Sequence, residues 1–280
     1  MLQAAIGELG GEQGIGRFIK KGDVVLIKPN VGFERDPRLG ATTNPDVLRS
    51  LIRLVRQAGA KKILVADNPI EQPAACFLRS KIQEAAEQEG AKVILPAAVH
   101  FQSVQIRAGL PDAGRHEALG TWPIFWKPLA EANKVIGIAP VKDHNLCNAS
   151  MSMKNWYGLL GGRRNQFHQA IHHIVSDLGF MMSPTLVIND GTLVMMRNGP
   201  TGGRLEDVKE GNVIVAGVDP IATDAWTCEH VLGRDPAHLT YLQYAHDKFG
   251  GQHFEQAKRF GQLDWSSLQR EGKIVETLVG

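Results

Sequence analysis

Short apolar runs alternate with segments of helical periodicity, and this alternation constrains the fold more than any other feature of the chain. The runs Asp23–Pro29, Lys62–Ala66 and Lys92–Leu95 are rich in β-branched residues and are typical of buried strands. Between them, Val47–Val55 and Phe77–Glu89 carry apolar residues at helical spacing. This order predicts an α/β protein with a mostly parallel sheet and helices on both faces.

Two of the expected helices have clear start signals. Asn44 is a favoured N-cap, Pro45 suits the first helical position, and Gly59 ends the segment. Asp219–Pro220 repeats the pattern and predicts a helix through about Leu232. Asp219 is therefore most simply a helix cap.

The length allows one large α/β domain over residues 1–280. Further strands are predicted at Lys134–Ala139, Thr185–Ile188 and Asn212–Ala216. Glycines and prolines interrupt residues 100–133, so we expect a seam between lobes there. Whether two lobes enclose one cleft stays open.

Composition excludes several classes of protein. Lys and Arg number 31 against 29 Asp and Glu, which is too weak a bias to predict nucleic acid or an anionic membrane as partner. No apolar run is long enough for a membrane span. The segment 1–10 reads as a helix and not as an export signal, so two localisations stay open: cytoplasmic, or exported if a signal segment was removed upstream of Met1.

The cysteines are few and widely spaced. Cys76, Cys147 and Cys228 are odd in number and form no CxxC pair. We therefore expect no disulfide and no iron–sulfur cluster within this chain. Cys147 follows His144 by three residues, but nothing in the sequence indicates an activated nucleophile.

Polar residues gather where predicted strands end, which is where ligands bind in open α/β sheets. Lys28 lies at the C-terminal edge of the first strand, and Asn30 follows it. A lysine there can neutralise an anion, and an asparagine offers both a donor and an acceptor. The plain alternative is a solvated lysine and a turn asparagine.

A second polar group surrounds two lysines. Lys142 and His144 follow the predicted strand Lys134–Ala139, and Lys154 and Asn155 come soon after. Crowded or buried lysines lose proton affinity and can act as bases or nucleophiles near neutral pH. The alternative is a flexible surface loop, but the apolar residues around Lys154 argue against a loop that is fully exposed to solvent.

Histidines border an expected helix over Phe167–Leu178. His168 and His172 are four residues apart and could face one divalent transition metal, with His144 as a third ligand. His144 and His168 could equally form an acid/base pair. The alternative is that these are boundary histidines of an amphipathic helix.

Acids also follow strands or open helices. Asp190 follows Thr185–Ile188, and Asp224 lies in the first turns of the helix after Asp219. Both are candidates for contacting a substrate. Dinucleotide-binding and P-loop glycine patterns are absent from the sequence.

Eight motifs in order resemble the DUF362 family of uncharacterised α/β proteins. The resemblance covers roughly Val24 to Gly250 and rests on IKPN (27–30), TTNPDVLRSLIRLVRQAGAKKILVADN (42–68), KDHN (142–145), SMKNWYGLLGG (152–162), RNQFH (164–168), INDG (188–191), NGPTGG (198–203) and AGVDPIATDA (216–225). Many members carry a ferredoxin-like insert with two four-iron clusters, which this sequence lacks. The resemblance implies that the motif lysines, His144, His168 and the acids line a common cleft.

The hypothesis that follows is an enzyme acting on a small anionic metabolite with a carboxylate. Lys142, His144, Lys154 and His168 are the expected catalytic residues, and Lys28, Asn30, Asn155, Asp190 and Asp224 the expected substrate contacts. Metal assistance through His144, His168 and His172 is left open. So are two rivals: a non-catalytic metal- or anion-binding protein, and a subunit of a redox complex whose cluster lies on a partner protein.

Overall fold

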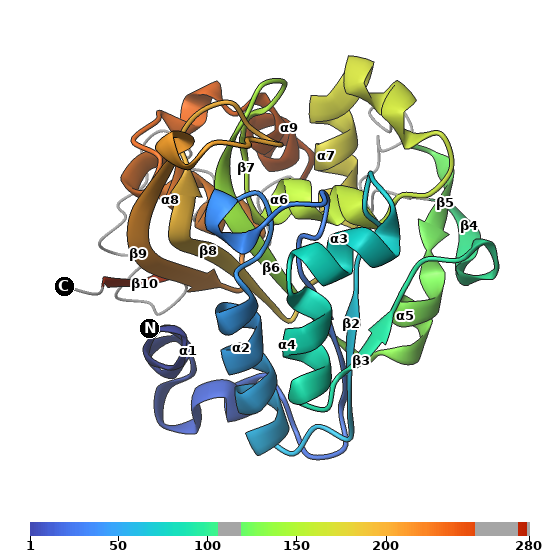
Figure 1. The fold of residues 1–280 in the computed structure, drawn as a ribbon, viewed down its shortest axis with the longest axis vertical. Helices are drawn as coiled ribbons and strands as arrows, with labels where there is room; N and C mark the ends of the chain where they lie inside the picture. The colour runs from blue at the N-terminus through green and yellow to red at the C-terminus, as the bar shows by residue number, and fades with distance from the viewer. Residues whose placement is uncertain (106–118, 250–273, 279–280) are drawn as a thin grey trace.

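Strands from along the chain assemble into one mixed β-sheet (Figure 1). The computed structural model describes residues 1–105, 119–249 and 274–278. The strands are β1 (Val24–Lys28), β2 (Lys62–Ala66), β3 (Lys92–Ile94), β6 (Lys134–His144), β7 (Asn148–Ser150), β8 (Leu186–Met195), β9 (Val208–Gly217) and β10 (Ile274–Leu278), and a separate antiparallel pair joins β4 (Phe101–Gln105) to β5 (Thr121–Phe125).

The strand order is β10-β9-β8-β6-β1-β2-β3, with β7 paired to β6. The pairs β6–β8, β1–β6, β1–β2 and β2–β3 are parallel. The pairs β8–β9, β9–β10 and β6–β7 are antiparallel. The sheet is therefore mostly parallel, and the predicted α/β class is confirmed.

Helices cover both faces because side chains alternate along each strand. Val25 and Ile27 share a core with helices α1, α2 and α4, whereas Leu26 faces the opposite core with α7, α8 and α9. Figure 1 shows α1, α2 and α4 together on one side of the sheet. The helices are α1 (Leu2–Gly10), α2 (Pro45–Gln57), α3 (Pro73–Arg79), α4 (Ile82–Gln88), α5 (Trp126–Glu131), α6 (Ser152–Asn155), α7 (Ile171–Met181), α8 (Pro220–His230) and α9 (Thr240–Phe249).

Local capping chemistry sets the helix starts. The Asn44 side chain accepts from Asp46 N at 2.9 Å, with Pro45 at the first position of α2. The Asp219 side chain accepts from the amides of Ile221 and Ala222 at the start of α8. Both caps were predicted from the sequence and are confirmed.

Several predicted elements differ from the structure. β8 and β9 are longer than the strands expected at Thr185–Ile188 and Asn212–Ala216, so Asp190 lies within a strand rather than after one. The helix expected over Phe77–Glu89 is split into α3 and α4, because Lys81 adopts a left-handed conformation with φ 59°. The strand expected to end at Ala139 continues to His144, because pairing with β7 extends it. The helix expected from Phe167 begins at Ile171, because Ala170 departs from helical dihedrals and residues 164–170 form a 3₁₀ helix.

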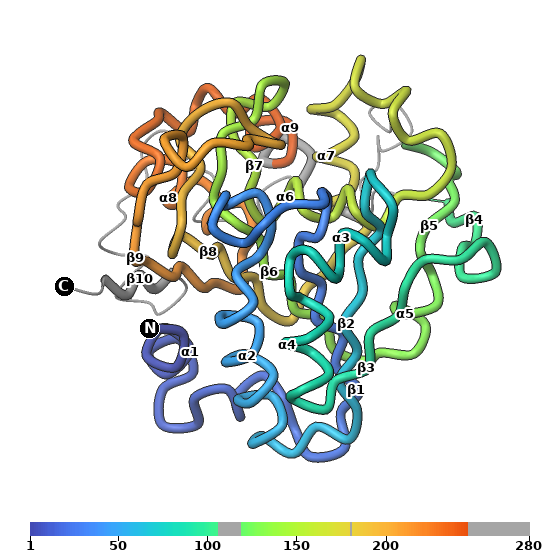
Figure 2. The backbone as a smooth tube through the Cα atoms, in the orientation of Figure 1, coloured from blue at the N-terminus to red at the C-terminus, as the bar shows by residue number. Residues whose placement is uncertain are grey.

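The parallel strands β1, β2 and β6 end at the same edge of the sheet. Figure 2 shows the chain that follows β1 and β2 passing next to α6. The described part of the expected seam forms β4, β5 and α5, and residues 106–118 lie outside the described residues. Among the described residues, no helix has the length and hydropathy that a membrane crossing requires.

Candidate functional site

A buried ion pair joins the ends of β1 and β2. Lys28 Nζ lies 2.6 Å from Asp67 Oδ1, with side chains 0% and 2% exposed. Lys28 Nζ also donates to Pro29 O at 2.8 Å and to Asn155 Oδ1 at 3.0 Å, so its three protons have partners. Burial lowers the pKa of Lys28 and Asp67 opposes that shift. Lys28 therefore lies beneath the site, with its ammonium already satisfied.

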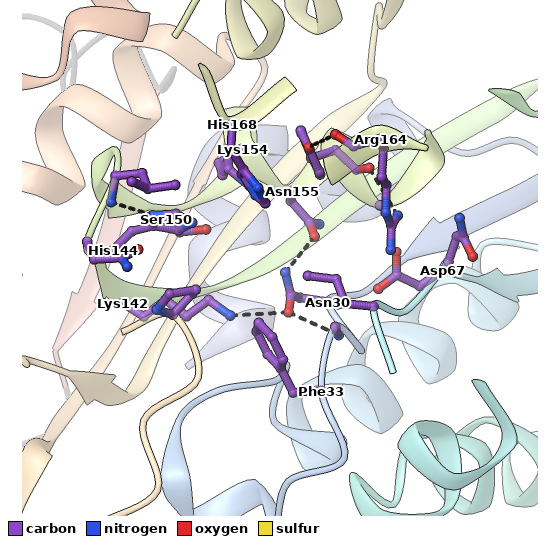
Figure 3. Close-up of a pocket in the computed structure, with 18 residues that line it drawn as sticks. Asn30, Phe33, Asp67, Lys142, His144, Ser150, Lys154, Asn155, Arg164 and His168 are labelled. Atoms are coloured by element: carbon purple, nitrogen blue, oxygen red, sulfur yellow. Dashed lines mark hydrogen bonds between the residues drawn. The ribbon is translucent and has the colours of Figure 1, made fainter. Parts of the chain in front are cut away.

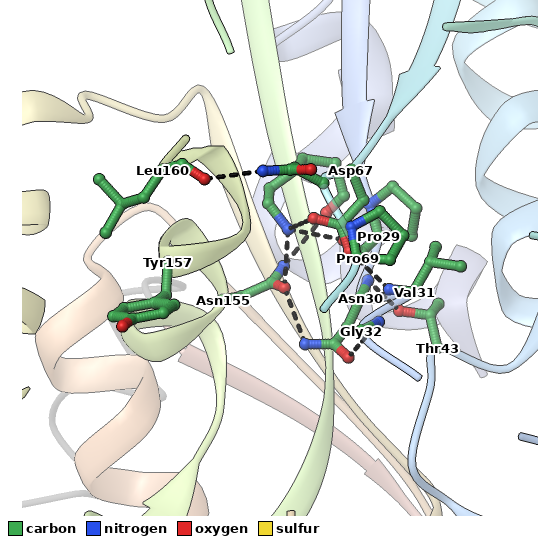
Figure 4. A network of polar contacts seen from close by, with 12 residues as sticks. Pro29, Asn30, Val31, Gly32, Thr43, Asp67, Pro69, Asn155, Tyr157 and Leu160 are labelled. Atoms are coloured by element: carbon green, nitrogen blue, oxygen red, sulfur yellow. Dashed lines mark hydrogen bonds and ion pairs between the residues drawn. The ribbon is translucent and has the colours of Figure 1, made fainter. Parts of the chain in front are cut away.

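Asn155 links α6 to the sheet edge (Figure 4). Its side-chain oxygen accepts from Lys28 and from Asn30 Nδ2, and its amide donates to the carbonyls of Lys28 and Ile138. The chain then passes so close to the ion pair that a Cβ on Gly158 would lie 2.1 Å from Asp67 Oδ1. Only glycine permits this approach.

Lys142 lies on β6 and enters a cavity of about 250 Å³ above this network (Figure 3). Its Nζ donates to Ala41 O at 2.6 Å and to Asn30 Oδ1 at 3.3 Å, and it lies 5.2 Å from the Phe33 ring centroid. Burial, reinforced by the charge of Lys154, lowers the pKa of Lys142 to about 7. A lysine with such a pKa is partly neutral at physiological pH.

Lys154 and Arg164 add two more cations to the cavity wall. Lys154 Nζ lies 4.1 Å from the Tyr157 ring centroid, and burial lowers the pKa of Lys154 to about 8. Arg164 donates to the carbonyls of Pro69, Leu160 and Tyr157. Within the described residues, neither side chain, nor Lys142, forms an ion pair with a carboxylate.

His144 is held in one tautomer. Its Nδ1 accepts a hydrogen bond from Leu146 N at 3.1 Å, so the proton of the neutral ring lies on Nε2. Burial, followed by the charges of Lys154 and Lys142, lowers the pKa of His144 to about 2. The ring lines the cavity as a neutral hydrogen-bond donor, which suits it to polarise a substrate oxygen.

His168 lies at the exposed side of the same cavity. Its ring stacks on Tyr157 with centroids 6.1 Å apart. Burial and the charge of Lys154 lower the pKa of His168, so it too favours the neutral form. His172 is absent from the residues that line the cavity.

The three histidines do not fit a metal centre in this geometry. No group of three His, Cys, Asp or Glu side chains suited to a metal ion occurs in the part of the chain that the structure describes. His168 lies in the 3₁₀ segment and His172 in α7, so the expectation of one continuous helix carrying both histidines is wrong. In this tautomer Nδ1 is the unprotonated nitrogen of His144, and it already accepts a hydrogen bond from Leu146 N.

The two candidate acids, Asp190 and Asp224, do not line the cavity. Their carboxylates instead accept hydrogen bonds from segments next to it. Asp190 accepts from Asn44 N and from the Thr192 hydroxyl. Asp224 accepts from Ser152 N and Oγ and from Met153 N, and burial raises the pKa of Asp224 to about 6. Asp224 thereby fixes the start of α6, which carries Lys154 and Asn155.

Several cavity residues were not singled out from the sequence as site residues. Asp67, which directly follows the predicted strand Lys62–Ala66, and Arg164 appear in the sequence analysis only within family motifs. Phe33 and Tyr157 contact the lysines through their rings, which no spacing rule predicts. The cysteines are buried, and burial raises the pKa of Cys147 to about 11, which disfavours its thiolate.

Fold and site together define an α/β protein with a cationic cavity at the carboxyl ends of its parallel strands. The chain belongs to the family described as "Domain of unknown function (DUF362)", which matches residues 25–229. It is similar to the Thylakoid-associated protein sll1697 of Synechocystis sp. (strain ATCC 27184 / PCC 6803 / Kazusa), with 28% identity over 236 residues that cover 80% of this chain and 67% of that protein.

A solved structure with partial similarity is the lactate racemase apoprotein from Thermoanaerobacterium thermosaccharolyticum. The sequence identity is 14% and the TM-score is 0.43. The match covers 81% of this chain and 53% of the racemase chain, so this chain spans about half the length of that protein.

Proposed function

We propose that this protein is an enzyme that acts on a small anionic substrate with a carboxylate group. The observation that carries the proposal is that Lys142, Lys154 and Arg164 line one cavity without an ion-paired carboxylate among the described residues. Unpaired buried cations are unfavourable unless an anion completes them. At about 250 Å³ the cavity suits a small molecule.

The protonation states favour catalysis over simple binding. A site that only binds anions gains from fully charged lysines, whereas the pKa of Lys142 is lowered to about 7. Such an amine can take a proton from a substrate and return it. In this proposal Lys142 is the base, Lys154 and Arg164 hold the carboxylate, and His144 donates to a substrate oxygen through Nε2. His168 contacts the substrate from the open side.

The first experiment tests binding. Thermal unfolding is measured with a panel of small carboxylates and with their neutral amides. We expect carboxylates to raise the melting temperature and amides to have little effect, because only an anion pairs with the cations. Equal responses to acids and amides would contradict the proposal.

The second experiment separates an enzyme from a binding protein. Acids that bind are incubated in heavy water, and exchange of the hydrogen next to the carboxylate is followed by proton NMR. We expect Lys142→Met to slow exchange about 10²–10⁴-fold. Lys209→Met is the control because that lysine is exposed and outside the cavity. Tight binding without exchange or other turnover would favour the binding protein.

A further inference from the structure

Two large apolar side chains border the cavity although they are exposed to solvent. Ile70 is 51% exposed and follows β2, and Leu146 is 43% exposed and lies in the turn between β6 and β7. Both line the cavity that contains Lys142 and Lys154. We call Ile70 and Leu146 the apolar rim.

Backbone hydrogen bonds hold the rim in place. Ile70 N donates to Gly32 O at 3.0 Å, which fixes the chain after β2 to the chain after β1. Leu146 N donates to His144 Nδ1 at 3.1 Å, which fixes the turn to the cavity wall. These two side chains are therefore presented by anchored backbone at the mouth of the site.

The cavity wall changes in character from the rim inward. Phe33 is an apolar neighbour of the buried lysine, since it lines the cavity and its ring centroid is 5.2 Å from Lys142 Nζ. Lys142 itself is only 2% exposed. Figure 3 shows Phe33 and Lys142 on the same side of the cavity. Lys142 and Arg164 thus lie on the buried part of the wall, while the exposed part carries the apolar Ile70 and Leu146 beside the polar Asn145 and His168.

We infer that the substrate is an amphipathic anion, with its carboxylate at Lys154 and Arg164, beside the base Lys142, and an aliphatic or aromatic group against the apolar rim. This inference rests on the proposed function and specifies the other end of the substrate. Covering half-exposed Ile and Leu side chains removes apolar surface from water, which stabilises the complex.

The rim favours a small molecule over a protein partner. Stable protein interfaces bury about 800 Å² on each partner, with aromatic and aliphatic anchors at their centre. The rim comprises two side chains, and they border a cavity rather than a flat surface. A protein contact is therefore treated as an outcome of the test.

The experiment measures the affinity of acetate, butyrate, hexanoate and octanoate by titration calorimetry. We expect binding to tighten about 4-fold for each methylene that reaches the rim. The variant Ile70→Ser with Leu146→Ser should lose this dependence on chain length and keep the acetate affinity, since both backbone hydrogen bonds remain. The control is Leu78→Ser with Leu205→Ser, because those side chains are 74% and 60% exposed and lie outside the cavity.

The outcomes separate the two proposals. Equal affinity for all four acids would overturn the apolar rim and leave the carboxylate site standing. Octylamine binding as tightly as octanoate would overturn the assignment of the anionic end to the cationic wall. Failure of every acid to bind would refute the proposed function itself. A wild-type dimer that the rim variant converts to a monomer, in sedimentation, would identify the rim as a protein contact and overturn the inference.

Discussion

Lys28 Nζ and Asp67 Oδ1 form an ion pair of 2.6 Å in the interior, beneath the candidate site. Because Asp67 also accepts from Val31 N at 2.6 Å, one carboxylate ties β1, β2 and the chain after β1 together. The Asp67 carboxylate pairs with Lys28, so it forms no ion pair with Lys142, Lys154 or Arg164.

Breaking this pair should destabilise the protein strongly. Asp67→Asn leaves the buried Lys28 ammonium uncompensated, and we expect a loss of about 3–5 kcal/mol in the free energy of unfolding. Urea denaturation measures it. The control is Glu206→Gln in the exposed pair with Arg204, where the change should stay within about 0.5 kcal/mol. A loss below about 1 kcal/mol for Asp67→Asn would contradict this account.

A methyl group at Gly158 should disturb the same pair. The added Cβ would lie 2.1 Å from Asp67 Oδ1 and 2.8 Å from Lys28 Nζ, so either the pair or the chain must move. We expect Gly158→Ala to lower stability by at least about 1–3 kcal/mol. Gly7→Ala in α1 is the control, because nothing lies within 4 Å of its Cβ and helical alanine should stabilise slightly. Equal melting temperatures for the two variants would count against the close approach.

Replacing Lys142 should stabilise the protein in a pH-dependent way. The pKa of Lys142 falls from an ordinary value of 10.5 to about 7, so between these values the unfolded chain binds more protons than the folded one. The contribution of Lys142 to the free energy of unfolding therefore rises with pH in that window and is lowest below about pH 7. We expect Lys142→Met to raise the melting temperature more at about pH 6 than at about pH 9. An equal gain at both pH values would show that the ammonium is not penalised by burial.

Anion binding should follow the opposite trend with pH. Lys142 and Lys154 lose protons as pH rises through their lowered pKa values of about 7 and about 8. We expect sulfate, whose charge is constant in this range, to bind at least about 10-fold more weakly at pH 9 than at pH 6. Calorimetric titration at a series of pH values tests this. The dependence of sulfate affinity on pH should be weaker in the Lys142→Met variant. A pH-independent affinity would assign the anion contact to Arg164 alone.

His144 should stay neutral with its proton on Nε2. Its pKa is lowered to about 2 and its Nδ1 accepts from Leu146 N. Nitrogen-15 NMR of the imidazole should show a protonated Nε2 that does not titrate between about pH 5 and pH 8. His144→Gln provides the assignment by loss of the signal. A shift of the proton to Nδ1, or its loss when zinc is added, would contradict the donor role.

Much of the fold could be predicted because its signals are local. Asn44 and Asp219 cap helices through amides two or three residues away, and apolar periodicity identifies the strands. One error occurs where strand pairing overrides the local pattern. β6 extends through Lys142 and His144 because β7 pairs with it, and polar residues in that strand read as a loop.

The sequence by itself determined the α/β class, the starts of α2 and α8 and the gathering of polar residues at strand ends, since these depend on residues close along the chain. Only the tertiary structure decided which cations lack a carboxylate. Asn155 reaches Lys28 across 127 positions, and Asp67 pairs with Lys28 rather than with Lys142. Burial and spatial pairing set the charge, tautomer and pKa of each group, and neither is encoded in spacing along the chain.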